Sequence, residues 1–174
     1  MIVNILFIVA IIIAIPLVIA LFVKKEYKIE RKIIIDKPNN EVFEFIRFLK
    51  NQEQYSKWVM MDPNMKKEFR GIDGTVGFVY AWDGNDKAGK GEQELISMVE
   101  GKSLDIELRF ERPFKAIAKA PMLTDSVSED KTRVTWGMQG KYNYPMNLMN
   151  LVVDKILGKD METSLVTLKG ILEK

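Results

Sequence analysis

Residues 104–111 alternate strictly between apolar and charged side chains. The apolar positions are Leu104, Ile106, Leu108 and Phe110, and the charged ones are Asp105, Glu107, Arg109 and Glu111. A period of two residues is typical of a β-strand with one dry and one solvated face, the usual arrangement in antiparallel sheets. Because the dry face must be covered, the rest of the chain has to supply an element that packs on it.

Most of the chain predicts strands, and its end predicts a helix. We expect strands at Glu26–Ile35, Lys66–Arg70, 76–82, 89–99, 104–111, 115–125 and 132–140. We expect short helices from Asn39 or Asn40 to Leu49 and at 52–58, and a long helix at 145–173 with a bend near Gly158. Strands in succession that are closed by a helix indicate an α+β fold. The predicted architecture is a curved antiparallel sheet of about six to seven strands wrapped on the long C-terminal helix.

Residues 2–23 are an uncharged run that is apolar except at Asn4 and Pro16. As a helix the run would be about 33 Å long, enough for a hydrocarbon core of about 30 Å. No basic residue precedes the run, and it is longer than the apolar part of a signal peptide, which favours an uncleaved span. Basic residues follow it, so the positive-inside rule predicts a single-pass membrane protein with a cytoplasmic domain. We therefore divide the chain into a transmembrane anchor, 1–25, and one folded domain, 26–174.

The composition excludes several classes of function. The chain has no histidine and no cysteine. This excludes a serine–histidine triad, a cysteine nucleophile and a zinc site built from nitrogen and sulfur ligands. The net charge is +2, from 26 Lys and Arg against 24 Asp and Glu, so no overall field attracts nucleic acid. We predict no metal, no cofactor and no nucleic-acid partner.

A set of short motifs runs in order through residues 28–174. The motifs are EVFEFI (41–46), KW (57–58), VG (76–77), YAWDGN (80–85), GKG (89–91), Phe110, PF (113–114), TRVTWGM (132–138), GKDME (158–162) and LVTLK (165–169). In this order they resemble the SRPBCC superfamily of START-like, helix-grip proteins. The resemblance is to its bacterial polyketide cyclase/dehydrase and lipid-transport branch. It implies a cavity between the sheet and the C-terminal helix that holds a hydrophobic ligand, but it does not imply one particular activity.

Large side chains on the inward strand faces, together with Trp58, Leu148 and Val152 of the predicted helices, are the candidate lining of this cavity, with core filling as the alternative interpretation. The candidates are Trp58, Phe78, Tyr80, Trp82, Gln93, Leu95, Phe110, Trp136, Met138, Leu148 and Val152. Among them Tyr80 and Gln93 are the polar groups that would orient a ligand. Glu92 and Glu94 have the opposite parity and should face solvent, so they are unsuited to acid–base chemistry. The sequence identifies no catalytic residue.

These observations predict a membrane-anchored protein that binds a hydrophobic small molecule or lipid. Its partners would be that ligand and, through the N-terminal helix, a membrane. One alternative is an enzyme similar to polyketide cyclases or dehydratases, in which Tyr80, Gln93 or a pocket water transfers protons. Another is a partner-binding module whose cavity is filled by its own side chains.

Overall fold

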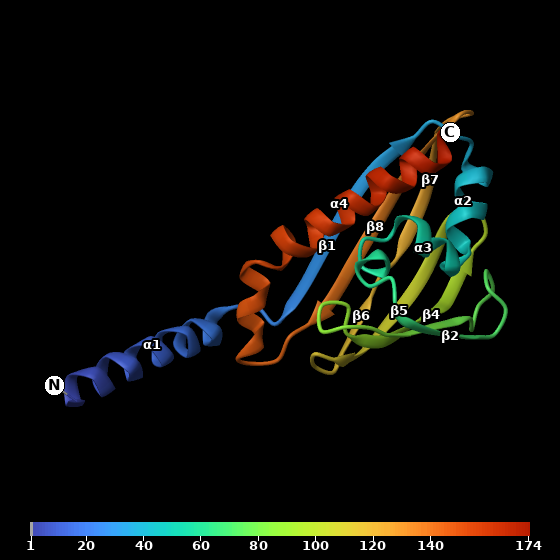
Figure 1. Cartoon of the computed structure of the whole chain (residues 1–174). Helices are drawn as coiled ribbons and strands as arrows, with labels where there is room; N and C mark the ends of the chain where they lie inside the picture. Colours follow the sequence, from blue (N-terminus) through green and yellow to red (C-terminus); the bar gives the residue numbers. More distant parts are fainter. Residues whose placement is uncertain (1) are drawn as a thin grey trace.

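A computed structural model describes residues 2–174, with the backbone alone described at 3, 6 and 9. One curved antiparallel sheet of eight strands packs against a long C-terminal helix (Figure 1). The strands are β1 (Glu26–Ile35), β2 (Lys66–Arg70), β3 (Val79–Asp83), β4 (Lys90–Val99), β5 (Ser103–Arg112), β6 (Ala116–Lys119), β7 (Met122–Ser128) and β8 (Lys131–Lys141). The helices are α1 (Ile2–Phe22), α2 (Asn39–Arg47), α3 (Gln52–Tyr55) and α4 (Val153–Leu172), and the 3₁₀ turns are η1 (Leu49–Asn51), η2 (Val59–Met61) and η3 (Met146–Leu151). The predicted α+β fold with a terminal helix on a curved sheet is confirmed.

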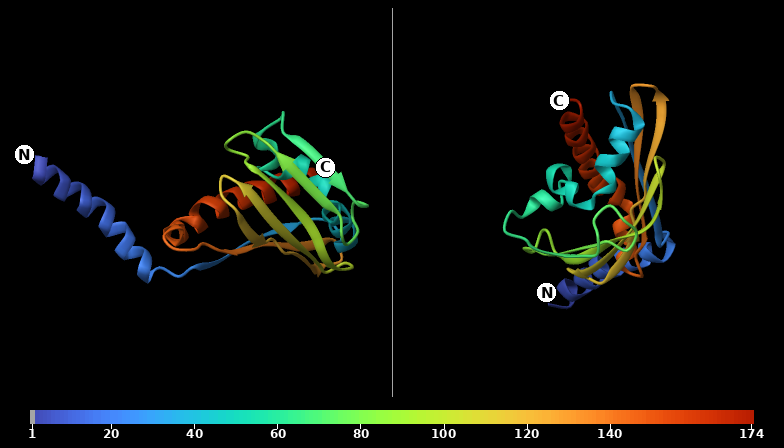
Figure 2. Two further views of the ribbon diagram at one scale, coloured as in Figure 1. Left: turned by 90° about the horizontal axis from the view of Figure 1, so that it is seen from below. Right: turned by 90° about the vertical axis from the view of Figure 1, so that its right-hand side faces the viewer.

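The strands follow the order β1-β8-β6-β5-β4-β3-β2, and β7 pairs with both β5 and β8. Figure 2 shows the sheet curling around α4. The core lies where α4 and α2 pack on the apolar face of the sheet. Its fully buried members include Ile35, Phe43, Ile46, Leu104, Met122, Val134, Met161 and Leu168. This arrangement leaves the other sheet face to the charged side chains of the alternating pattern.

One predicted strand is two strands in the structure. The segment 115–125 is divided into β6 and β7 at Ala120 and Pro121. Proline has no amide hydrogen to donate to a strand ladder, so it interrupts regular pairing. Its carbonyl still accepts a hydrogen bond from the amide of Gly137 at 2.8 Å, which keeps the connection against β8. The sheet therefore has one strand more than the largest number predicted.

The strand expected at 76–82 begins only at Val79. Gly77 has a φ of +89°, a conformation in which glycine is favoured, and its amide donates to the carbonyl of Leu95 at 2.8 Å. Val76 therefore lies outside the strand and is 56% exposed. Residues from Phe78 onward keep the predicted alternation.

The C-terminal helix begins later than predicted. Val152 adopts φ −123° and ψ −8°, which separates η3 from α4. Helical structure then continues through Gly158, which is buried against β1. A Cβ atom at Gly158 would lie 1.9 Å from Nη2 of Arg31, so this glycine leaves room for the guanidinium of Arg31 against α4. The Nε of Arg31 donates to Glu162 at 2.6 Å, which fastens β1 to α4.

The end of α1 is held by asparagines of the η3 segment. The buried Asn147 donates from Nδ2 to the carbonyl oxygens of Ala20 and Val23 at 2.6 and 2.8 Å. Asn150 donates in the same way to Lys24 at 2.8 Å. The last carbonyls of a helix have no hydrogen-bond donor within the helix, so these side-chain amides supply the donors that the end of α1 lacks. From this attachment α1 extends away from the sheet (Figures 1 and 2).

Within the described part of the chain, no helix has the length and apolar character needed to cross a membrane. The predicted single-pass membrane localisation is therefore wrong, and the predicted transmembrane helix and membrane partner are not supported. The division of the chain at residues 25 and 26 stays a prediction.

Candidate functional site

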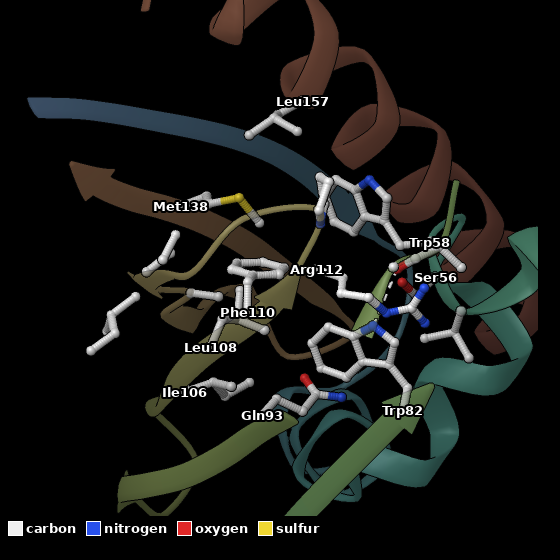
Figure 3. A pocket seen from close by; sticks show the side chains of 18 of the residues that line it. Ser56, Trp58, Trp82, Gln93, Ile106, Leu108, Phe110, Arg112, Met138 and Leu157 are labelled. Atoms are coloured by element: carbon white, nitrogen blue, oxygen red, sulfur yellow. Dashed lines mark hydrogen bonds between the residues drawn. The ribbon is translucent and has the colours of Figure 1, made fainter. Parts of the chain in front are cut away.

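A cavity of about 260 Å³ lies between the sheet and α4 (Figure 3). Its walls come from β1, β3, β4, β5, β6 and β8, from the segment of α3 and η2, and from Leu157 of α4. The volume is slightly below the roughly 300–1,000 Å³ of common small-molecule pockets. A small apolar molecule, or the apolar part of a larger one, fits such a space.

The structure brings seven of the eleven candidate residues to the cavity wall. They are Trp58, Tyr80, Trp82, Gln93, Phe110, Trp136 and Met138. Trp58 lies just before η2; the other six are placed by their strands, because residues two apart share a sheet face, as Tyr80 and Trp82 do on β3. Ile106, Leu108 and Phe110 line the cavity for the same reason, and Figure 3 shows them along β5.

The other four candidates lie elsewhere. Phe78 and Leu95 are buried in the core, where the ring of Phe78 stacks on Phe69 with centroids 6.2 Å apart. Both have the inward parity, but Phe78 directly precedes β3 and Leu95 lies farther along β4, and neither reaches the cavity wall. Leu148 and Val152 precede α4 and are not among the lining residues. Val152 is 43% exposed.

Sequence reasoning missed much of the remaining wall. The missed residues include Tyr27, Gln52, Ser56, Met65, Lys87, Arg112, Phe114, Lys141, Tyr142 and Leu157. One missed set had a sequence signal: Ala116, Ala118 and Ala120 alternate on one face, and all three line the cavity. Small inward side chains leave space where larger ones would fill the core. The loop residues gave no periodic signal, because a loop has no regular inward face.

Trp58 and Trp136 form an aromatic corner of the cavity. Their ring centroids are 5.6 Å apart at an interplanar angle of 80°, an edge-to-face contact. Trp58 is positioned by the preceding residue, since the amide of Lys57 donates to Oγ of Ser164 on α4 at 3.0 Å. The corner therefore depends on the docking of α4.

The polar side chains Gln52, Gln93 and Tyr80 of the inner wall are neutral and already hydrogen-bonded within the protein. Nε2 of Gln93 donates to Oε1 of Gln52 at 3.0 Å. The hydroxyl of Tyr80 donates to Oε1 of Glu53 at 3.3 Å. Burial, followed by the charge of Glu53, raises the pKa of Tyr80 above its ordinary value, so the phenol stays protonated at neutral pH. These groups can hydrogen-bond a ligand, but Tyr80 is not available as a base.

Glu92 and Glu94 lie on the face of the sheet opposite the cavity, as their parity predicts. Arg109 donates from Nε to Glu92 at 2.8 Å and from Nη2 to Glu94 at 2.6 Å. Hydrogen bonds from Arg70 and Arg109 lower the pKa of Glu92. In the described part of the chain no group of three or more acidic side chains is arranged to hold a metal ion.

No protein family model and no curated protein matches this chain. Solved structures do match. Norcoclaurine synthase from Thalictrum flavum, in complex with dopamine and hydroxybenzaldehyde, has a TM-score of 0.66 at 9% identity, over 88% of this chain and 90% of its own. A hypothetical protein from Helicobacter pylori has a TM-score of 0.62 at 13% identity, over 83% and 87%. A protein from Nitrosospira multiformis has a TM-score of 0.59 at 17% identity, over 83% and 94%.

At these identities the likeness concerns the fold alone. The chain has the helix-grip fold of START-like and birch-pollen-allergen-like proteins.

Proposed function

We propose that this chain binds a hydrophobic small molecule or lipid in the cavity between the sheet and α4. The observation that carries the proposal is an open space of about 260 Å³ with mainly aromatic and aliphatic walls. Burying apolar ligand surface there contributes about 25 cal/mol per Å². The resemblance of the motifs to the branch of polyketide cyclases and lipid-transport proteins favours the same kind of ligand. A protein of this fold, norcoclaurine synthase, was solved with two small aromatic compounds.

The two alternatives have less support. A cyclase or dehydratase that uses Tyr80 as a base is disfavoured, because burial and Glu53 keep the phenol protonated. Gln93 is hydrogen-bonded to Gln52, and an amide does not titrate near neutral pH. A binding module with a filled cavity is disfavoured by the open volume.

The test measures binding of Nile red, a neutral apolar dye whose fluorescence rises in apolar surroundings, to the full chain. We expect saturable binding to the unchanged protein. Ala118→Phe places a large ring in the cavity and should weaken dye binding at least about tenfold, a loss of about 1.4 kcal/mol. Ala81→Phe is the matched control, because Ala81 lies between Tyr80 and Trp82 on the opposite face of β3.

A second measurement identifies the natural ligand class. The protein is incubated with a lipid extract, recovered, and its bound molecules are analysed by mass spectrometry. Enrichment of an apolar species on the unchanged protein but not on Ala118→Phe supports the proposal. Absence of dye binding together with absence of any enriched species contradicts it.

A further inference from the structure

The charged residues on the cavity wall all carry the same sign. Lys87, Arg112 and Lys141 line the cavity, and no aspartate or glutamate does so among the described residues. The chain as a whole is nearly balanced, with 26 basic and 24 acidic residues. A wall with cations only is therefore a local property of the cavity and does not reflect the composition.

The topology gathers the three cations at one end of the sheet. Lys141 ends β8, Arg112 ends β5, and Lys87 lies in the loop that follows β3. β5 and β8 both run antiparallel to β6, and β3 and β5 both run antiparallel to β4. The ends of these three strands therefore point in the same direction.

The positive charge of this rim is only partly neutralised. Nη2 of Arg112 donates to Oδ1 of Asp83 at 2.5 Å and to the carbonyl of Gly84 at 3.0 Å. Its Nε and Nη1 have no hydrogen-bond partner among the described residues. Neither Lys87 nor Lys141 has a carboxylate within ion-pair distance in the described part of the chain. By contrast, the guanidinium of Arg109 on the outer face contacts three glutamates.

The inner wall of the cavity, unlike its rim, carries no charge among the described residues. Gln52, Gln93 and Tyr80 are uncharged and already hydrogen-bonded, and aromatic and aliphatic groups surround them. Figure 3 shows Arg112 together with the aromatic side chains Trp82 and Phe110. The cavity therefore has an apolar interior and a cationic rim. Low-dielectric walls beside a cation strengthen its attraction for an anion.

We propose that the ligand is an amphipathic carboxylic acid whose carboxylate lies between Lys87, Arg112 and Lys141 and whose apolar part fills the cavity. This inference rests on the proposed function. A guanidinium presents a planar set of donors that matches a carboxylate, and each lysine adds a point charge. A neutral apolar molecule would occupy the same space but would leave the rim unused.

The test is displacement of Nile red from the full chain by decanoate, methyl decanoate and decanol, which share a chain of ten carbon atoms; decanoate is an anion and the other two are neutral. We expect decanoate to displace the dye at a concentration roughly tenfold lower than the two neutral compounds. Lys87→Gln and Lys141→Gln should each raise the decanoate concentration about two- to fivefold, the range for exposed charge pairs. Both should leave displacement by methyl decanoate unchanged. Added salt should reduce the advantage of decanoate.

Lys119→Gln is the matched control, because Lys119 is an exposed lysine of β6 that is not part of the wall. It removes the same charge and should have no effect. The lysine variants decide the test, since Arg112→Gln would also remove the bonds to Asp83 and Gly84. Equal displacement by all three compounds, unchanged by the lysine variants, would overturn this inference and leave the proposed function intact. Absence of Nile red binding to the unchanged protein, together with absence of any species enriched from the lipid extract, would overturn the proposed function itself.

Discussion

Gly158 shows how a single residue determines the contact between the first strand and the last helix. In a helix, glycine is less favourable than alanine by about 1 kcal/mol, so its presence in α4 needs a reason. The reason is Arg31, whose guanidinium occupies the place that a Cβ atom would take. From there Arg31 bonds Glu162 and, through Nη1, Asp154 at 3.0 Å. Glycine at position 158 lowers the helix propensity of α4, but it leaves the space in which Arg31 forms these bonds between β1 and α4.

We predict that Gly158→Ala has opposite effects on stability in two backgrounds. With Arg31 present, the new methyl group displaces the guanidinium, and the free energy of unfolding should fall by about 1–2 kcal/mol. With Arg31→Ala, the same substitution should raise the free energy of unfolding by up to about 1 kcal/mol through helix propensity. Unfolding in urea, followed by circular dichroism, measures all four proteins of this double-mutant cycle.

Gly170→Ala is the control for this cycle. Gly170 lies in the same helix, and a Cβ atom there meets nothing within 4 Å. The substitution should be stabilising in both backgrounds. If Gly158→Ala behaved like Gly170→Ala in the presence of Arg31, the close contact would not be the reason for this glycine.

At the scale of elements, the outer face of the sheet is held by a cluster of opposite charges on β2, β4 and β5. Glu92 is its centre, since it accepts hydrogen bonds from Arg109 at 2.8 Å and from Arg70. These bonds lower the pKa of Glu92 in the folded state. A carboxylate with a depressed pKa stabilises the fold above its unfolded pKa, and this contribution is lost as the pH falls through the folded pKa.

We predict that Glu92→Gln makes the stability of the protein less dependent on pH on the acid side. The unchanged protein should lose stability as the pH falls below about 4.3, the ordinary pKa of glutamate. The variant should lose less over the same interval, by about 1 kcal/mol or less, because an amide does not titrate there and the pairs are partly solvated. Thermal unfolding at a series of pH values measures the difference.

Glu129→Gln serves as the comparison, because Glu129 is exposed and has no ion pair among the described residues. This substitution should leave the loss of stability at acid pH unchanged. Equal curves for the Glu92 and Glu129 variants would show that the cluster contributes nothing to acid sensitivity.

At the scale of the whole molecule, the sequence predicted correctly those parts of the structure in which the local sequence pattern and the tertiary contacts favour the same conformation. Strand parity predicted that Tyr80, Trp82 and Phe110 face inward, because the pleat fixes that alternation. The extent of the cavity along the strands was not predictable. Phe78 and Tyr80 have the same parity, but only Tyr80 reaches the open space. That difference depends on where α2 and α4 dock, which no local pattern records.

The cationic rim of the cavity could not be predicted from the sequence for a second reason. Lys87 and Arg112 lie at loop positions or strand ends, where a cation ordinarily indicates a solvated surface. Their common placement depends on strand order, which brings residues far apart in sequence to one end of the sheet. The alternating small residues Ala116, Ala118 and Ala120 are a sequence signal of open space on the inward face.

Because its walls come from nearly the whole chain, a ligand should stabilise the molecule as a unit. Tyr27 near the start of β1 and Leu157 in α4 both contact the same space. Ligand at a concentration of about 100 times its Kd adds about 2.7 kcal/mol to the stability of the folded state. We predict that decanoate slows hydrogen exchange in β1, β5, β8 and α4 together, measured by mass spectrometry. In Ala118→Phe, the same concentration should leave exchange unchanged. Slower exchange confined to the loops at the rim would instead indicate a surface site, because a ligand outside the cavity touches only those loops and cannot link β1 to α4.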